Sequence, residues 1–553
     1  MKATSLLVVC VVAAGCASSG ARIGNEGTAG NETIPPGTAT RAERSRYTET
    51  STYADVIVFL DSLHGRKELS FGSIGKSGEG RDIPYVIASR PRVSTPAEAR
   101  ALGRPIVYIQ GNIHAGEVEG KEALLALLRS LTQTAAPNVL DSLILIAVPI
   151  YNADGNEKFA SQVKNRGSQN GPELVGERAN AQGLDLNRDY IKAEAPETRA
   201  SLAMFNAWDP DVFVDLHTTD GSYHGYALTY APPLNPAAPL GIFARDSLLP
   251  PIALRMKAHG FPTFDYGDFI SDDTLSKGWA TFDSRPRFGT NYYGLRGRIA
   301  ILSEAYSHDT FRRRVSATFR FVLELLSVVA ARGATIQAVT NAASRAPTLG
   351  YEPGASPLSI PIRSQMVAAP DSVAVIAEDL ERTGDSTRTQ PGVPKGMRRT
   401  GRFHAVTMPV FDRFKPVLFA PPPVAYAIPA ADTEAVRLLR LHGIVVDSLS
   451  VAATARAENF VTDSTIVSPR PFQGHHEVHL VGRWMSQPRE LPAGTYIART
   501  SQPLRILLVY LLEPESDDGL VTWNFFDGAL LSRGAYPVLR VMNDPRPVSP
   551  SRQ

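Results

Sequence analysis

The chain has very little cysteine: Cys10 and Cys16 are the only two in 553 residues, and none follows residue 16. This excludes a disulfide framework or a thiolate metal site from the rest of the protein, so any metal there must be held by His, Asp or Glu. An excess of charge of one sign is also missing, because 57 Lys and Arg face 55 Asp and Glu for a net charge of +2. We therefore expect no nucleic-acid partner.

The N-terminal apolar run, residues 6–14, is too short for a membrane span. It follows Lys2 and precedes Val-Ala-Ala-Gly-Cys16, which resembles the signal peptide of a bacterial lipoprotein, whose cysteine becomes the lipidated first residue. Ordinary signal cleavage near the same small residues is the alternative. Residue 18 is Ser rather than Asp, and analogy then favours the outer membrane. We predict an exported protein that touches a membrane only through this lipid: an outer-membrane lipoprotein facing the periplasm, or otherwise a periplasmic or extracellular protein.

The chain is longer than one compact hydrophobic core accommodates, so we expect two domains. Residues 1–16 are the predicted signal peptide and 17–45, with few large apolar groups, a flexible tether. Residues 46–335 form the first predicted domain and 336–360 a linker. Residues 361–553 have short apolar runs and many prolines, a predicted helix at 432–442 and a polar loop at 381–402. They predict a second domain, α+β or mainly β, whose role the sequence does not define.

Apolar strands and amphipathic helices alternate along the first domain. Candidate strands are 105–110, 142–150, 212–216 and 299–303, and candidate helices are 119–132, 196–207, 251–259 and 310–331. This alternation predicts an α/β fold with a mostly parallel, mixed sheet covered by helices on both faces. Ligands of such folds bind beyond the carboxyl ends of strands. His114, His217 and Glu304 each follow a predicted strand by no more than four residues.

Four motifs carry the chemistry, in this order: His114-Ala-Gly-Glu117, Asp-Leu-Asn187-Arg188, Asp215-Leu-His217 and Leu-Ser-Glu304. Two histidines and a carboxylate form a catalytic zinc set that leaves a position for water, whose pKa zinc lowers to about 7. Glu304 stands outside that set and is a candidate general base. Asp215 is a candidate to orient His217, although an ordinary strand-end aspartate is equally compatible. Arg188, beside an amide, is suited to bind a substrate carboxylate.

These motifs resemble the zinc carboxypeptidase family, the carboxypeptidase A-like metallopeptidases, over about residues 47–335. The resemblance implies that His114, Glu117 and His217 bind one zinc ion, and that Glu304 is the general base. It implies that Asn187 and Arg188 hold the terminal carboxylate of the substrate.

The same resemblance implies an arginine that stabilises the oxyanion, for which Arg166 is the better match and Arg178 the second. It also implies a tyrosine that covers the substrate. Tyr292 and Tyr293 are the nearest candidates, with Tyr266 left open. Asp283 and Gly289 fall in the stretch that shapes the specificity pocket, but they do not decide between apolar and basic side chains.

The function that the resemblance implies is an exported zinc metallocarboxypeptidase, which hydrolyses C-terminal peptide bonds of substrates with a free carboxylate. Glu304 would act on a zinc-activated water. A zinc amidohydrolase of the aspartoacylase or succinylglutamate desuccinylase type, acting on N-acyl amino acids, is the first alternative, since it shares three of the motifs. The Pro196-Glu197-Thr198 segment and the predicted export favour the peptidase. A catalytically silent peptide-binding relative is the second alternative.

The second domain has a cluster of its own. His475, Glu477 and His479 would share one face of a strand. A second metal site is one interpretation, and a solvated strand edge is the one we favour, because no further ligand group accompanies the cluster.

Overall fold

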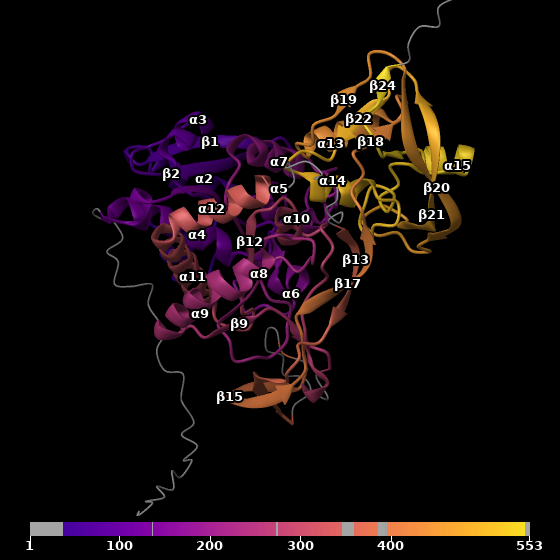
Figure 1. Cartoon of the computed structure of the whole chain (residues 1–553). Helices are drawn as coiled ribbons and strands as arrows, with labels where there is room; N and C mark the ends of the chain where they lie inside the picture. The colour runs from indigo at the N-terminus through magenta and orange to yellow at the C-terminus, as the bar shows by residue number, and fades with distance from the viewer. Residues whose placement is uncertain are drawn as a thin grey trace, which may run out of the picture.

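The computed structural model describes residues 37–134, 137–271, 275–345, 359–384, 393 and 395–547. Its centre is an eight-stranded sheet in the order β1–β2–β4–β3–β7–β12–β8–β9. In Figure 1 the strands β1 and β2 lie at the upper left, β12 in the middle and β9 below. The strands are β1 (Leu69–Lys76), β2 (Asp82–Ala88), β3 (Ile106–Gly111), β4 (Ile144–Val148), β7 (Val212–Thr218), β8 (Leu228–Ala231), β9 (Thr263–Asp265) and β12 (Ile299–Ala305). Strands β4, β3, β7 and β12 are mutually parallel, whereas the β1–β2, β2–β4 and β12–β8 pairs are antiparallel. The sheet is therefore mixed with a parallel centre.

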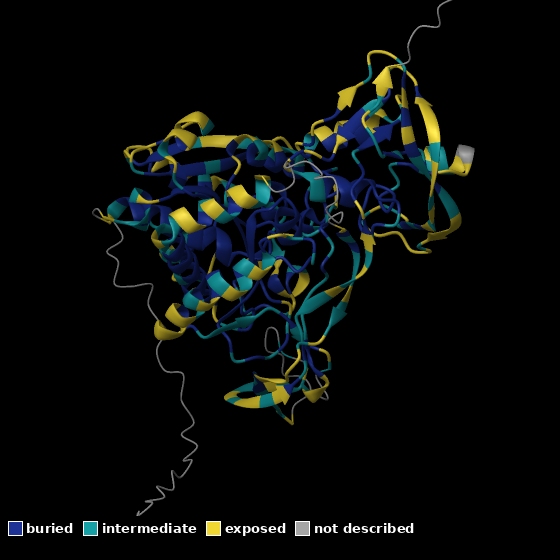
Figure 2. Ribbon diagram, viewed as in Figure 1, coloured by how far each residue is buried: buried dark blue, intermediate teal, exposed yellow. Residues whose placement is uncertain are grey.

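Alternate residues of the central strands enter two hydrophobic cores. Val107 and Ile109 of β3 join a core with α2 (Tyr53–Asp61), α4 (Glu119–Gln133), α9 (Leu249–Ala258) and α11 (Phe311–Ala331). Ile106 and Tyr108 join a second core with α7 (Pro196–Trp208) and α10 (Gly289–Leu295). Successive side chains of a strand point to opposite faces. Helices thus cover both faces, and the sheet is buried between them (Figure 2).

Two glycines bring α4 against the sheet. A Cβ on Gly111 would lie 2.9 Å from the carbonyl carbon of Gly120, and a Cβ on Gly120 would lie 2.8 Å from the Cβ of Leu216. Asn112 follows with φ of 65°, a conformation that Asn tolerates better than most residues. The loop between β3 and α4, which carries His114 and Glu117, is therefore held tightly at the carboxyl end of the sheet.

All eight predicted elements are present, with ends that differ by no more than two residues. Two predicted boundaries are wrong. Helix α1 (Arg41–Arg44) starts behind the capping residue Thr40 and buries Ala42, so the tether cannot extend to residue 45. Helix α12 (Gly333–Arg345) occupies residues 336–345 of the predicted linker. The signal-peptide prediction, with Cys10 and Cys16, lies outside the described residues.

The C-terminal region is mostly β. Its seven-stranded sheet has the order β19–β22–β18–β23–β20–β21, with β24 paired to β20. These strands are β18 (Ala425–Ile428), β19 (Asp447–Ser448), β20 (Ala453–Val467), β21 (Val478–Leu491), β22 (Tyr496–Arg499), β23 (Leu539–Val541) and β24 (Arg546–Pro547). Helices α13 (Thr433–Leu441), α14 (Arg505–Leu512) and α15 (Asp527–Arg533) accompany them. The helix predicted at 432–442 is therefore present.

Two ribbons of two strands connect the regions: β13 (Ile360–Val367) with β17 (Arg413–Ala420), and β14 (Val373–Arg382) with β15 (Met397–Met408). The latter pair occupies both ends of the predicted polar loop 381–402, which corrects that prediction. The remaining short elements are α3 (Pro96–Leu102), α5 (Ala153–Glu157), β5 (Ala160–Ser161), α6 (Gln162–Asn165), β6 (Leu174–Val175), α8 (Gly241–Phe243), β10 (Asp268–Phe269), β11 (Trp279–Ala280) and β16 (Val410–Phe411).

The C-terminal region shares its larger hydrophobic core with the first region, and only a small cluster around Ala425, Ile497 and Val541 is its own. Its buried residues Tyr426, Leu438 and Leu508 belong to the same hydrophobic cluster as Phe205 of α7 and Tyr292 of α10. The region therefore packs on the face of the central sheet that α7 and α10 cover. In the described part of the chain no single helix is long and apolar enough to span a membrane. Helices α11 and α12 meet the length and apolarity of a span only when taken together, and they are bent by 83° relative to each other.

One buried acid makes the stability of this joint core depend on pH. Burial raises the pKa of Asp517 to about 7; the Tyr510 hydroxyl donates to it and opposes the rise, while repulsion from Asp518 adds to it. Between about pH 4 and pH 7 the folded protein holds a proton here that the unfolded chain has lost, so stability falls as pH rises through this window. Asp517→Asn should remove that fall. We expect the melting temperature of the variant, relative to that of wild type, to rise as the pH is raised from 4.5 to 7.5. A difference in melting temperature that stays constant over this range would contradict the role given to Asp517.

Candidate metal centre

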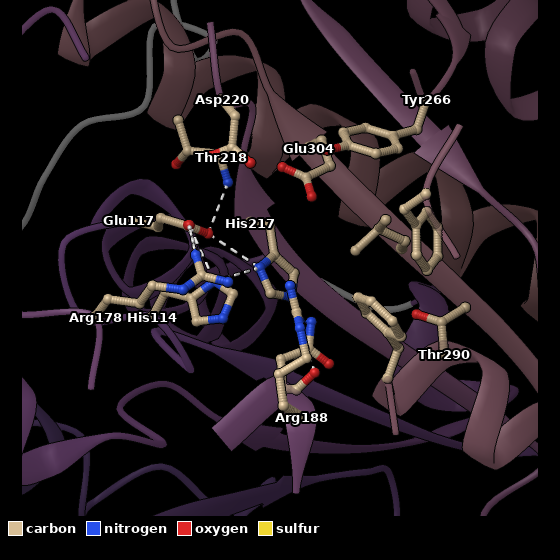
Figure 3. Close-up of a pocket in the computed structure, with 14 residues that line it drawn as sticks. His114, Glu117, Arg178, Arg188, His217, Thr218, Asp220, Tyr266, Thr290 and Glu304 are labelled. Atoms are coloured by element: carbon tan, nitrogen blue, oxygen red, sulfur yellow. Dashed lines mark hydrogen bonds and ion pairs between the residues drawn. The ribbon is translucent and has the colours of Figure 1, made fainter. Parts of the chain in front are cut away.

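Three buried side chains converge at the carboxyl ends of β3 and β7. His114 and Glu117 come from the loop after β3, and His217 comes from β7 itself. Each Nδ1 lies 3.0 Å from an oxygen of Glu117, and the two Nδ1 atoms are 3.2 Å apart. The candidate ligand atoms all lie within 4.8 Å of one another, and no second such group of His, Cys, Asp or Glu exists among the described residues. Figure 3 shows the three side chains facing one another.

A carboxylate lies behind each imidazole. Asp185 Oδ1 is 3.0 Å from His114 Nε2, and Asp215 Oδ2 is 3.0 Å from His217 Nε2. A carboxylate in this position favours the tautomer with the proton on Nε2, which leaves the Nδ1 lone pair for a metal. Two neutral imidazoles and one carboxylate then fit a zinc ion with an open coordination position. Asp215 lies beside His217, as considered from the sequence. The matching contact of Asp185 with His114 was not predicted, although Asp185 begins the Asp-Leu-Asn-Arg motif.

Glu304 faces the same cavity from the neighbouring strand. Strands β7 and β12 are parallel, and their register places Glu304 beside His217. Glu304 is only 7% exposed, and its Oε2 has no hydrogen-bond partner in the described structure. Burial raises the pKa of Glu304 well above its usual value; His217 opposes the rise and the charge of Glu117 adds to it. The cavity is thus lined by a buried carboxylate with an unpaired oxygen.

Asn187 and Arg188 line the cavity from a short 3₁₀ turn at Leu186–Arg188. The Asn187 side-chain oxygen accepts a hydrogen bond of 2.9 Å from the Gly289 backbone N–H. The Arg188 guanidinium lies 4.1 Å from the centre of the Phe288 ring and donates to the Asn187 carbonyl. The ring and the carbonyl fix the plane of the guanidinium, which favours two-point binding of a carboxylate.

The two candidate oxyanion arginines differ in position. Arg166 is 8% exposed, and its guanidinium is occupied by Glu117, Asp220 and the carbonyls of Thr218 and Thr219. It does not line the cavity, so the preference for Arg166 is wrong. Arg178 does line it, with a side chain that is 35% exposed.

Tyr292 and Tyr293 were wrongly predicted to contact substrate. Both lie on α10 with no exposed surface. Tyr293 packs 4.0 Å from the ring of Phe205, and the Tyr292 hydroxyl lies 2.7 Å from His442 Nδ1. Both tyrosines of α10 pack in the hydrophobic core between this helix and the sheet. Tyr266, between β9 and β10, lines the cavity instead.

The cluster of His475, Glu477 and His479 is neither a metal site nor a solvated edge. His475 Nε2 lies 2.9 Å from Glu194 Oε1 of the catalytic region, and Glu477 accepts a hydrogen bond of 2.6 Å from Arg287. These pairs join the C-terminal region to the two segments that flank the cavity. In the specificity stretch, Asp283 pairs with Arg285 and is absent from the cavity lining.

The geometry agrees with the comparisons with known proteins. The family model of the zinc carboxypeptidases matches residues 57–238. The chain carries a zinc carboxypeptidase domain. The matched range of this zinc carboxypeptidase domain includes the three candidate ligands and the Asn187–Arg188 pair, whereas Glu304 lies beyond it.

The similar proteins are carboxypeptidases. Carboxypeptidase 2 of Trichophyton equinum is 24% identical over 493 residues, which covers 84% of this chain and 81% of the fungal protein. Residues 1–335 make up less than 84% of the chain, so the aligned part must extend into the C-terminal region. The catalytic chain of human carboxypeptidase N is 36% identical over 127 residues, covering 21% of this chain and 25% of its own length.

Solved carboxypeptidase structures are similar to about half of the chain, and two of them serve as examples. A metallo-carboxypeptidase of Burkholderia cenocepacia is 19% identical with a TM-score of 0.37, covering 51% of this chain and 69% of its own. Carboxypeptidase A of Helicoverpa armigera is 16% identical with a TM-score of 0.37, covering 51% and 74%.

Proposed function

We propose that this protein is a zinc metallocarboxypeptidase that removes the C-terminal residue of peptides. One observation carries the proposal: the candidate ligand set, the free carboxylate of Glu304 and the Asn187–Arg188 pair all line one cavity. A substrate whose terminal carboxylate binds Arg188 has its last peptide bond brought towards His217 and Glu304. The same cavity therefore accounts for both bond cleavage and the choice of the chain end.

Each residue of the cavity has a separate role in the proposed reaction. His114, Glu117 and His217 would hold a zinc ion, which supplies Lewis acidity to polarise the scissile carbonyl and acidify water. Glu304, whose carboxylate lines the cavity, takes a proton from the attacking water and returns it to the leaving nitrogen. Arg178, whose cationic side chain is open to the cavity, is placed to stabilise the negative oxygen of the tetrahedral intermediate.

The test uses matched peptides with free and amidated C-termini, with and without a chelator, analysed by mass spectrometry. We expect loss of single residues from the free acids only. Arg188→Ala should lower kcat/KM for the free acids by about 100-fold, because it removes a charge that pairs with a buried carboxylate. Arg437→Ala is the control, since that arginine is 59% exposed on α13.

Other outcomes would replace the proposal. Internal cuts, or an Arg188→Ala variant as active as the control, would refute the carboxylate-binding role. Cleavage of N-acyl amino acids alone would point to the amidohydrolase. No chelator-sensitive hydrolysis of any peptide or amide would point to a binding protein.

We also propose that the enzyme acts outside the cytoplasm, on the basis of the apolar run at 6–14 and the Gly-Cys16 sequence. Incorporation of labelled fatty acid that Cys16→Ser abolishes would support a lipid anchor. Equal labelling of the variant would exclude one at Cys16.

A further inference from the structure

A tight turn of the C-terminal region contacts the backbone of Asp185, the residue behind the candidate ligand His114. Between β20 and β21, Phe472 and His475 exchange backbone hydrogen bonds of 2.8 and 3.0 Å across two residues. Those residues, Gln473 and Gly474, have φ of 50° and 84°. Positive φ at both central positions is the pattern of a type I′ turn, which favours Asn, Asp or Gly at the first. Glutamine there is unfavourable locally, so the turn itself does not explain the choice of residue.

The Gln473 side chain contacts the backbone of the catalytic region. Its Oε1 accepts a hydrogen bond of 2.9 Å from the N–H of Asp185, a residue 288 positions away in the sequence. The bond fixes the chain where the Asp-Leu-Asn-Arg motif begins.

Asp185 itself serves three functional groups. Its Oδ1 lies 3.0 Å from His114 Nε2 and accepts from the Asn187 N–H at 2.9 Å. Its Oδ2 accepts from Arg178 Nε at 2.9 Å. One carboxylate thus orients a candidate metal ligand, the carboxylate-binding pair and the candidate oxyanion arginine. A shift of its backbone would disturb all three.

The turn is held on both sides, so it can act as a fixed support. His475 bonds Glu194 Oε1 through Nε2 and Asn524 Oδ1 through Nδ1, each at 2.9 Å. The Arg287 guanidinium lies 5.2 Å from the centre of the Phe472 ring. These contacts restrain the residues on either side of Gln473.

We propose that Gln473 is a positioning residue: it holds the backbone of Asp185 in place and, through Asp185, orients His114 for zinc and the Asn187–Arg188 pair for the substrate. The substrate half of this inference rests on the proposed carboxypeptidase function. The metal half does not, because zinc binding can be measured without turnover.

Two variants of the full-length chain separate positioning from folding. Gln473→Asn suits the positive φ, so the turn should be at least as stable, but its oxygen is one methylene short of the Asp185 N–H. Gln473→Glu keeps both the length and an acceptor oxygen. For the Asn variant we expect about fivefold weaker zinc binding, in competition with a chromophoric chelator, and about fivefold higher KM for a free-acid peptide. The value of kcat should also fall, because Asp185 orients Arg178 as well, and the melting temperature should not fall. Gln473→Glu should restore both affinities to within about twofold of wild type.

The results decide in either direction. Wild-type zinc affinity and KM in the Asn variant would overturn the proposal. A fall in melting temperature that accompanies weaker binding in both variants would overturn it too, by showing a role in folding alone. If wild type cleaves no peptide, the proposed function fails, and the zinc competition still decides whether Gln473 positions the metal ligand.

Discussion

Glu304→Gln should reduce kcat about 10³- to 10⁴-fold and leave zinc bound. The substitution keeps the shape of the side chain but removes the proton acceptor, a carboxylate that lines the cavity. Glu304 is not among the converging ligands, so the metal content measured by mass spectrometry should stay at one ion per chain. Turnover is measured on a peptide with a free C-terminus.

Glu324→Gln is a suitable control for that experiment. Glu324 is a carboxylate on α11 that is only 8% exposed, and its partners Arg255, His259 and Arg320 do not line the cavity. It should keep kcat within about twofold. If Glu304→Gln retained more than about a tenth of wild-type turnover, the base would have to be Asp220, the other cavity carboxylate outside the ligand set.

The central sheet and the ligand set could be predicted because the same physical rule governs both. Near-continuous apolar strands such as 105–110 and 212–216 are typical of a buried parallel sheet. Parallel strands end at the same edge, so residues that follow them, His114 and His217, had to come together. The antiparallel strand β1 was not predicted, because only its first two residues are buried and its exposed positions carry Gly, Ser and Lys.

The failed assignments depend on contacts that periodicity does not encode. Tyr292 and Tyr293 have the right residue type and precede Glu304 closely in the sequence, yet the orientation of α10 turns both into the core. Arg166 is the better match to the family in sequence, and only the fold shows that backbone carbonyls occupy its guanidinium. The contact between Gln473 and Asp185 spans 288 residues and two regions, so no local pattern could reveal it.

The C-terminal region is best understood as part of the catalytic unit. It shares the hydrophobic core beneath α7 and α10, and it pairs with Glu194 and Arg287 on the two segments that flank the cavity. Removing it would expose that core surface and leave Arg287 without Asp518, with which it forms a buried ion pair of 2.7 Å. Variants of single contacts are therefore more informative than truncations.

The largest loss of metal is expected from His217→Ala. It removes one of the three ligands, so the variant should retain no zinc after dialysis against a weak chelator, and kcat/KM should fall more than about 10³-fold. Asp215→Asn tests the carboxylate behind the ligand: its oxygen remains 3.0 Å from His217 Nε2, but its charge is lost. We expect zinc affinity to weaken about tenfold, with turnover recovered at saturating zinc.

The order of these two effects tests the whole arrangement. A backing carboxylate acts only through the imidazole that it orients, so its loss cannot exceed the loss of the imidazole itself. Wild-type zinc content in His217→Ala would mean that the third ligand is another residue. Asp220 would then be the next candidate, because it too lines the cavity. If Asp215→Asn instead lost as much zinc as His217→Ala, Asp215 would have to bind the metal directly, and the ion would lie deeper than the Nδ1 atoms of His114 and His217 indicate.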